Sequence, residues 1–78
     1  MNLPRRQKQL YALLLGRGDV MIETLYAAIT DRAIDGRAMA DMQRWLGPYI
    51  TNLNRNLVDH GLRVEPGALK NTYRLVAV

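Results

Sequence analysis

Residues 48–78 read PYITNLNRNLVDHGLRVEPGALKNTYRLVAV, and the spacing of their apolar residues changes at Gly61. Before Gly61, apolar residues fall on one side of a helix: Ile50, Leu53, Leu57 and Val58. This spacing predicts a helix over residues 48–60 that begins at Pro48, because proline suits the first helical turn. After Gly61, residues 62–65 alternate between apolar and polar, and a β-prone run follows over residues 72–78. Two such runs around the loop 67–71 predict a β-hairpin.

The residues before this stretch predict further elements. Helical spacing over Pro4–Leu15, followed by Gly16, predicts a first helix. Residues 19–22 are short and β-prone, which indicates a brief strand, and a second helix is expected to open at Glu23. A turn is expected at 35–36, then a short helix over 37–46 that Gly47-Pro48 interrupts.

The predicted order is helix, short strand, helix, one or two further helices, and a C-terminal hairpin. A two-stranded hairpin is marginal alone and needs helices to cover its apolar face. The 78 residues therefore predict one α+β domain, mainly α, over residues 1–78. Its architecture is that of a winged helix-turn-helix with three to four helices and a β-hairpin wing.

The composition excludes several functions. The chain has no cysteine and no serine, and His60 is its only histidine. A Ser or Cys nucleophile and a His- or Cys-rich metal site are therefore impossible. We expect no enzyme, no cofactor and no metal. The longest apolar run, Tyr11–Leu15, is far too short to span a membrane, and no secretory signal follows the charged N-terminus. A cytoplasmic protein without a membrane partner is expected.

Charge is unevenly distributed along the chain, whose formal net charge is +4. Four cations and no acid lie in residues 1–18, and five cations and two acids lie in residues 42–78. Residues 19–41 carry five acids and two arginines. Two basic ends around an acidic middle indicate a surface that faces a polyanion, although +4 is also an ordinary charge for a soluble protein.

Three stretches resemble the OmpR/PhoB-type winged-helix effector domain. Residues 9–15, with Val20 and Leu25, resemble its first helix, strand and second helix. Residues 49–57, YITNLNRNL, resemble its recognition helix. Residues 61–65 and 71–75, GLRVE and NTYRL, resemble its wing. The resemblance implies a DNA-binding transcriptional regulator whose recognition helix, residues 48–60, enters the major groove while the wing, residues 62–78, contacts the backbone.

Carried onto this chain, the resemblance implies DNA-facing residues on the recognition helix and the wing: Thr51, Asn52, Arg55, Asn56 and Arg74. Asparagine pairs with adenine and arginine with guanine, which fits such a surface. Lys70 is added for its charge and its place in the wing loop. Arg5 and Arg6 are added as cations that the first helical turn does not favour.

A second function stays open, because the chain has Asn52, Asn54 and Asn56 where the family's helix is rich in arginine. The alternative is a protein-interaction module on the same scaffold, such as a phage-encoded modulator of a host protein. Trp45 and Tyr49 would anchor the partner, since tryptophan and tyrosine are enriched in binding hot spots. A homodimer through Trp45 or the edge strand 76–78 is also open. Residues 1–78 include no receiver domain, so if the protein binds DNA we expect a free-standing regulator of the kind that phages and plasmids carry.

Overall fold

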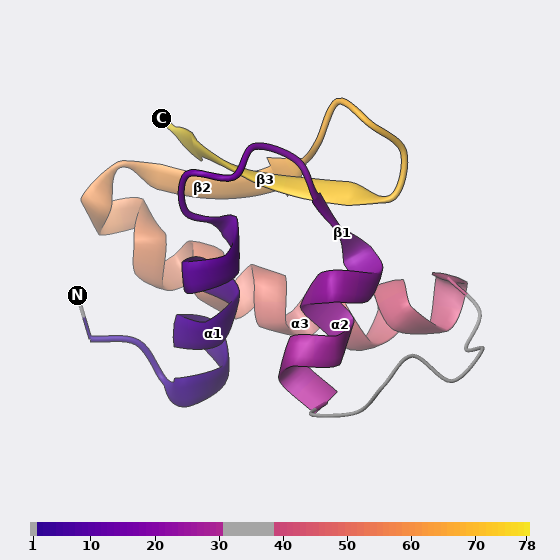
Figure 1. The fold of residues 1–78 in the computed structure, drawn as a ribbon. Helices are drawn as coiled ribbons and strands as arrows, with labels where there is room; N and C mark the ends of the chain where they lie inside the picture. Colours follow the sequence, from indigo (N-terminus) through magenta and orange to yellow (C-terminus); the bar gives the residue numbers. More distant parts are fainter. Residues whose placement is uncertain (1, 31–38) are drawn as a thin grey trace.

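The computed structural model describes residues 2–30 and 39–78 (Figure 1). The described residues form three α-helices and a 3-10 turn: α1 (Arg5–Leu14), α2 (Ile22–Thr30), α3 (Met39–Leu57) and η1 (Val58–His60). They also form three strands: β1 (Val20–Met21), β2 (Leu62–Pro66) and β3 (Thr72–Ala77). The order of elements confirms the predicted α+β class with a C-terminal hairpin, and the topology is winged-helix-like. The turn predicted at Asp35-Gly36 lies outside the described residues.

The strands form one antiparallel sheet in the order β1-β3-β2. The β2–β3 hairpin is in the register that sets Val64 opposite Leu75, and β1 adds two pairs on the other side of β3, Val20 with Tyr73 and Met21 with Thr72. The brief strand predicted at residues 19–22 is therefore confirmed as the third strand. It joins the α1–α2 connection to the wing.

The helices lie on one side of this sheet, below it in Figure 1, and the core fills the space between them. Each helix and each strand contributes buried or half-buried apolar side chains. The fully buried members are Leu10, Leu14, Leu25, Leu46, Leu53 and Leu57. Tyr73 and Leu75 of β3 pack against this core, as the hairpin's alternation predicts. The hairpin is thus part of the core rather than an appendage.

The prediction that Pro48 begins a new helix is wrong, because α3 runs without a break from Met39 to Leu57 with Pro48 inside it. Its buried stripe has steps of four, four, three and four residues: Met42, Leu46, Ile50, Leu53 and Leu57. An internal proline costs roughly 3 kcal/mol, whereas burying each of these side chains contributes about 1.5–3 kcal/mol. The stripe therefore outweighs the proline. Gly47 helps, because it has no Cβ to clash with the proline ring that follows.

The end of α3 agrees more closely with the helix end that the sequence predicts at His60. Its last α-helical residue is Leu57, and the 3-10 turn η1 continues the helix to His60. Gly61 then adopts a left-handed conformation with φ of 67°, and its N–H donates to the Val58 carbonyl. Glycine takes this conformation without the steric cost that a side chain would add. The change in the spacing of apolar residues at Gly61 thus marks the start of the wing. None of the helices in the described ranges is long and apolar enough to cross a membrane.

Candidate nucleic-acid interface

One side of α3 is exposed and polar. Its members follow one another at helical spacing and are called the α3 face: Arg44, Pro48, Thr51, Asn52 and Arg55. Their side chains make no hydrogen bond or ion pair with any other described residue. Three of the five, Thr51, Asn52 and Arg55, are residues that the resemblance implies. The structure therefore brings these three together on a surface that the fold itself does not use.

Arg44 belongs to this face although the sequence reasoning missed it. An expected break at Pro48 assigned Arg44 to a separate short helix, whereas the continuous α3 puts it on the same side as Arg55. The two arginines are eleven residues apart, which is about 16 Å along an α-helix. The major groove of B-DNA is about 12 Å wide. With this spacing, one arginine fits inside the groove while the other reaches the phosphates beside it.

The wing loop, residues 67–71, lies beside the N-terminal half of α3. The Gln43 side-chain amide donates to Asn71 Oδ1 at 3.4 Å, and Gln43 directly precedes Arg44. Lys70 is exposed in this loop. The wing cation and Arg44 therefore come from segments that touch, although they are 26 residues apart in the sequence.

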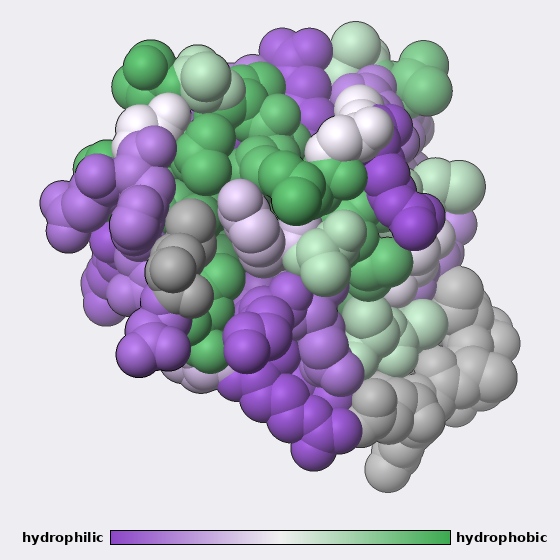
Figure 2. Space-filling view, turned by 60° about the vertical axis from the view of Figure 1, so that its left-hand side comes forward, coloured by the Kyte–Doolittle hydropathy of each residue, from purple (hydrophilic) through white to green (hydrophobic). Residues whose placement is uncertain are grey.

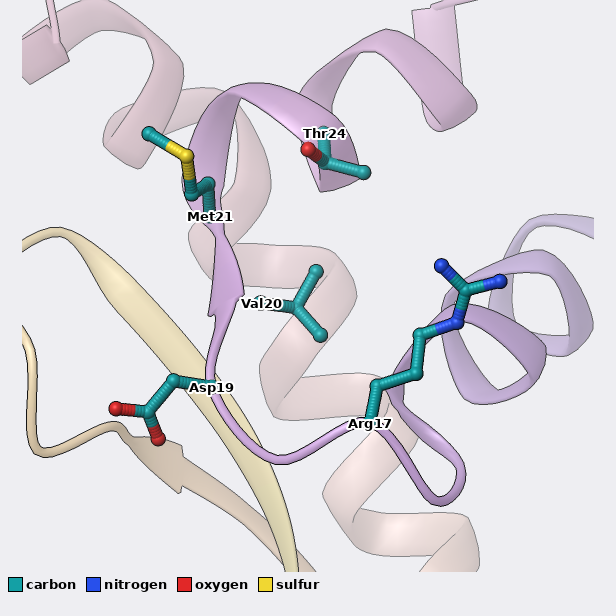
Figure 3. A pocket seen from close by; sticks show the side chains of 5 residues that line it. All are labelled: Arg17, Asp19, Val20, Met21 and Thr24. Carbon is teal, nitrogen blue, oxygen red and sulfur yellow. The ribbon is translucent and has the colours of Figure 1, made fainter.

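The wing loop is held by contacts to the rest of the domain. Asp19 points toward the hairpin in Figure 3, and its Oδ2 accepts the Leu69 N–H at 2.9 Å. The Thr72 hydroxyl donates to the Leu69 carbonyl at 2.6 Å, and the Ile22 N–H donates to the Asn71 carbonyl at 3.0 Å. A Cβ at Gly67 would lie 2.6 Å from Asp19 Oδ1, so this position requires glycine. The loop thus presents Lys70 from an ordered position.

Figure 3 also shows the neighbouring shallow hollow that the α1–β1 connection and the start of α2 form. Arg17 and Val20 point to one side of the chain there, while Asp19 and Met21 point to the other. Arg17 is exposed and makes no ion pair with the described residues. The hollow has no buried polar group that would define a ligand site.

Arg74 is engaged within the sheet. It alternates with the core-facing Tyr73 and Leu75 and so lies on the outer face, away from α3. Its Nη2 lies 2.9 Å from Glu65 Oε1, and Arg63 Nη2 lies 3.1 Å from Glu65 Oε2. The hydrogen bond from Arg74 has the largest effect on the pKa of Glu65 and lowers it below its ordinary value of 4.5. Burial, the next largest effect, opposes this, whereas the hydrogen bond from Arg63 and the charges of both arginines lower the pKa further. Arg74 therefore stands apart from the α3 face.

The remaining candidates belong to α1 and to the contact between α1 and α3. Arg6 is half-buried, and its Nη1 donates to Gln9 Oε1 at 3.3 Å and to the Ala28 carbonyl at 3.4 Å. Arg5 is exposed in the same turn, at the start of α1. That end of α1 lies far from the wing loop in Figure 1. Asn56 is exposed, and its side-chain amide donates to Gln7 of α1. Asn56 thus marks the border of the α3 face.

A second surface of α3 overlaps the α3 face at Arg44 and Pro48. Trp45 is 54% exposed, and a shallow, mainly apolar hollow is lined by Arg44, Trp45, Pro48 and Tyr49. Tyr49 is half-buried and packs against the core. An exposed tryptophan beside an apolar hollow is a feature of protein-binding surfaces.

Residues 2–30 and 39–78 contain no group of three or more His, Cys, Asp or Glu side chains that could hold a metal ion. Comparison with protein-family models, with curated proteins and with solved structures finds no match to this chain.

Proposed function

We propose that this protein is a small DNA-binding transcriptional regulator that inserts the α3 face into the major groove of double-stranded DNA. The observation that supports this most strongly is the α3 face itself. Two arginines, a threonine and an asparagine are exposed together on one helix and are not engaged by the described part of the fold. Unengaged donors on an exposed helix are what recognition of base edges and phosphates requires.

The residues of the α3 face divide by chemistry. Arg55 has the planar fork that pairs with guanine O6 and N7, and Asn52 has the amide that pairs with adenine N6 and N7. Arg44, near the other end of the face, contacts a phosphate. Lys70 contacts a phosphate from the wing loop, so two chain segments fix the orientation of α3 in the groove. Thr51 contributes a hydroxyl and a methyl group near the centre.

The experiment that tests this function is a binding titration with fluorescently labelled mixed-sequence DNA at low and moderate salt. We expect binding at micromolar protein in low salt that weakens steeply as salt rises, because released counterions drive the association. The variant in which Arg44 and Arg55 are both alanine should bind more weakly than wild type. Absence of binding at micromolar protein in low salt contradicts the proposal. Selection of bound sequences from random DNA then identifies the site.

A second function, a protein-interaction module, is favoured by one observation, the half-exposed Trp45 beside the apolar hollow. Trp45→Ala separates the two functions. As a DNA-binding protein, the variant should keep the salt-dependent affinity of wild type to within a few-fold, because the indole supplies no phosphate or base contact in the proposed docking. Failure of wild type to bind DNA, together with loss of a co-purifying partner from the Trp45→Ala variant, would favour the interaction module.

A further inference from the structure

The C-terminal half of β3 has a strand on only one side. On one edge, β3 pairs with β2 from Tyr73 to Ala77, whereas on the other edge β1 covers only Thr72 and Tyr73. Beyond Tyr73, the second edge of β3 has no strand partner in the described part of the chain. An unpaired edge is a template for a further strand.

The hydrogen bonds of the sheet reveal which backbone groups face this edge. The Val64 N–H and C=O are both bonded to the Asn54 side chain, so they do not bond to Leu75, which lies opposite. The Val78 N–H, in contrast, donates to Gly61 on the β2 side at 2.8 Å. Because the pattern alternates along an antiparallel ladder, the N–H and C=O groups of Leu75 and Ala77 point away from β2. They make no hydrogen bond with any other described residue.

The C-terminal residues of β3 are themselves apolar. Ala77 and Val78 are exposed, Val78 at 81%, and Leu75 and Val76 are half-buried. Figure 2 shows apolar surface gathered over the upper part of the molecule, where the sheet and the C-terminal end of α1 lie, with polar surface below it. Exposed apolar side chains next to unpaired backbone groups are the two requirements for the addition of a strand.

We propose that this edge pairs with the same edge of a second copy of the chain, which makes a two-fold symmetric dimer with a continuous six-stranded sheet. Only Leu75 and Ala77 offer outward groups, so an antiparallel arrangement has one register that uses them all. Leu75 of one copy pairs with Ala77 of the other, and the reverse, which makes about four hydrogen bonds. Val76 then lies on the two-fold axis, opposite Val76 of the partner.

The chemistry of the edge favours a second copy over another kind of strand. Residues 75–78 have no charged side chain, so self-pairing sets no like-charged side chains opposite one another. The nearest cation on the strand, Arg74, is already paired with Glu65. Valine opposite valine is a favourable cross-strand pair, and the two-fold axis repeats every contact. Since the contact is one strand wide, association is expected at micromolar or higher protein concentration.

The dimer does not depend on DNA binding, and the two are tested separately. If both hold, the two-fold axis presents two α3 faces, and the DNA recognised contains an inverted repeat.

The test uses substitutions at the axis, read by sedimentation equilibrium from micromolar to millimolar protein. For wild type, we expect the average mass to rise from 8.9 kDa toward twice that value. Val76→Glu and Val76→Lys each set two like charges across the axis and should weaken self-association about tenfold or more, whereas an equimolar mixture of the two should associate. Met21→Glu is the matched control, because Met21 is 54% exposed but lies on the β1 strand. It should associate as wild type does.

A measurement on the unmodified protein makes the test independent of how the variants fold. The Leu75 and Ala77 amide protons should exchange quickly with solvent in dilute protein and become protected as concentration rises, whereas protection of the Val76 amide should change little. A wild-type protein that stays monomeric throughout the range overturns the proposal. So does a folded Val76→Glu variant that associates as strongly as wild type.

Discussion

Asn54 and Val64 are joined by two hydrogen bonds that tie α3 to the free edge of β2. The Val64 N–H donates to Asn54 Oδ1 at 2.7 Å, and Asn54 Nδ2 donates to the Val64 carbonyl at 3.0 Å. The side-chain amide thus takes the place that the backbone of a neighbouring strand would occupy. Pro66, further along the same strand, has no N–H to offer. The edge of β2 is therefore closed to strand addition, in contrast to the C-terminal half of β3.

We expect Asn54→Ala to lower the free energy of unfolding by about 1–3 kcal/mol, because it leaves two partly buried backbone groups of Val64 without their partners. Denaturant unfolding followed by circular dichroism measures this. Asn52→Ala is the matched control, since Asn52 is on the same helix but exposed and unbonded, and its effect should stay within about 0.5 kcal/mol. Equal effects of the two substitutions would show that the Asn54–Val64 contact contributes nothing to stability.

Pro48→Ala is expected to stabilise the protein. Pro48 is exposed in the interior of α3, where proline lacks the N–H that a helix uses and costs up to about 3 kcal/mol relative to alanine. Alanine restores a donor to the Arg44 carbonyl, although part of the gain is offset because proline also restricts the unfolded chain. We expect a net increase of about 1–2 kcal/mol in unfolding free energy.

Gly47→Ala is a useful comparison for Pro48→Ala. Apart from its own helix and its chain neighbours, no atom lies within 4 Å of the added Cβ, but this Cβ meets the ring of Pro48, so we expect Gly47→Ala to stabilise the protein less than Pro48→Ala does. Backbone chemical shifts of wild type should be helical from Met39 through Leu57. A non-helical interruption at Gly47-Pro48, together with a loss of stability in Pro48→Ala, would instead favour a helix that begins at Pro48.

The order of elements could be predicted from the sequence because it depends on local signals. The spacing of apolar residues changes from helical to alternating at Gly61. The chain must leave the helix there, and the left-handed conformation of Gly61 ends it. The first helix, expected over Pro4–Leu15, is observed over Arg5–Leu14 for the same reason. The exposure of Thr51, Asn52 and Arg55 on one face also follows from local spacing, because their positions relative to Ile50 and Leu53 exclude them from the core.

The remaining features depend on tertiary contacts that spacing does not encode. Local rules favour a helix start at Pro48, but packing of Met42 and Leu46 against the core extends the helix across it. This error concealed Arg44. Asn54 looked like a neighbour of Asn52 on a polar helix, and only its distance to Val64 reveals that it serves the fold. The position of Asn54 indicates this role. Asn54 follows the buried Leu53 and lies on the other side of the buried stripe of α3 from Asn52.

Stability should depend on acid through Glu65. Its pKa in the folded protein lies below the ordinary value of 4.5, chiefly because of the hydrogen bond from Arg74. A lowered pKa means that the Glu65 contacts stabilise the fold fully above pH 4.5, and that this contribution disappears as pH falls through the lower, folded-state value. The melting temperatures of wild type and Glu65→Gln should therefore differ at neutral pH and converge as the pH falls through the folded-state pKa of Glu65. A difference that is constant with pH would exclude this linkage.

Removal of a phosphate contact should change the salt dependence of DNA binding. We expect Arg44→Ala and Lys70→Ala each to weaken binding to all sequences alike, and to reduce the slope of log affinity against log salt by about 0.9. Arg17→Ala is the control for net charge, because Arg17 is an exposed cation on the α1–β1 connection and forms no ion pair within residues 2–30 and 39–78. Titrations at four salt concentrations measure the slopes. If Arg17→Ala lowers the slope as much as the other two do, binding reflects overall charge and not the proposed docking.

Arg55→Ala should affect sequence preference more than salt dependence. Arg55 is the one arginine in the C-terminal half of α3, with Thr51 one turn before it and Asn52 beside them on the exposed side. A bidentate arginine–guanine contact distinguishes the correct base by about 1–3 kcal/mol. We expect the variant to lose about that much affinity for the selected site and little for unrelated DNA, and to stay as stable as wild type because the side chain is exposed. Repeating the random-sequence selection with the variant measures the change, which should fall at one base position. An unchanged selected sequence, from a folded variant, would mean that Arg55 does not read a base, and the α3 face would then contact the backbone alone.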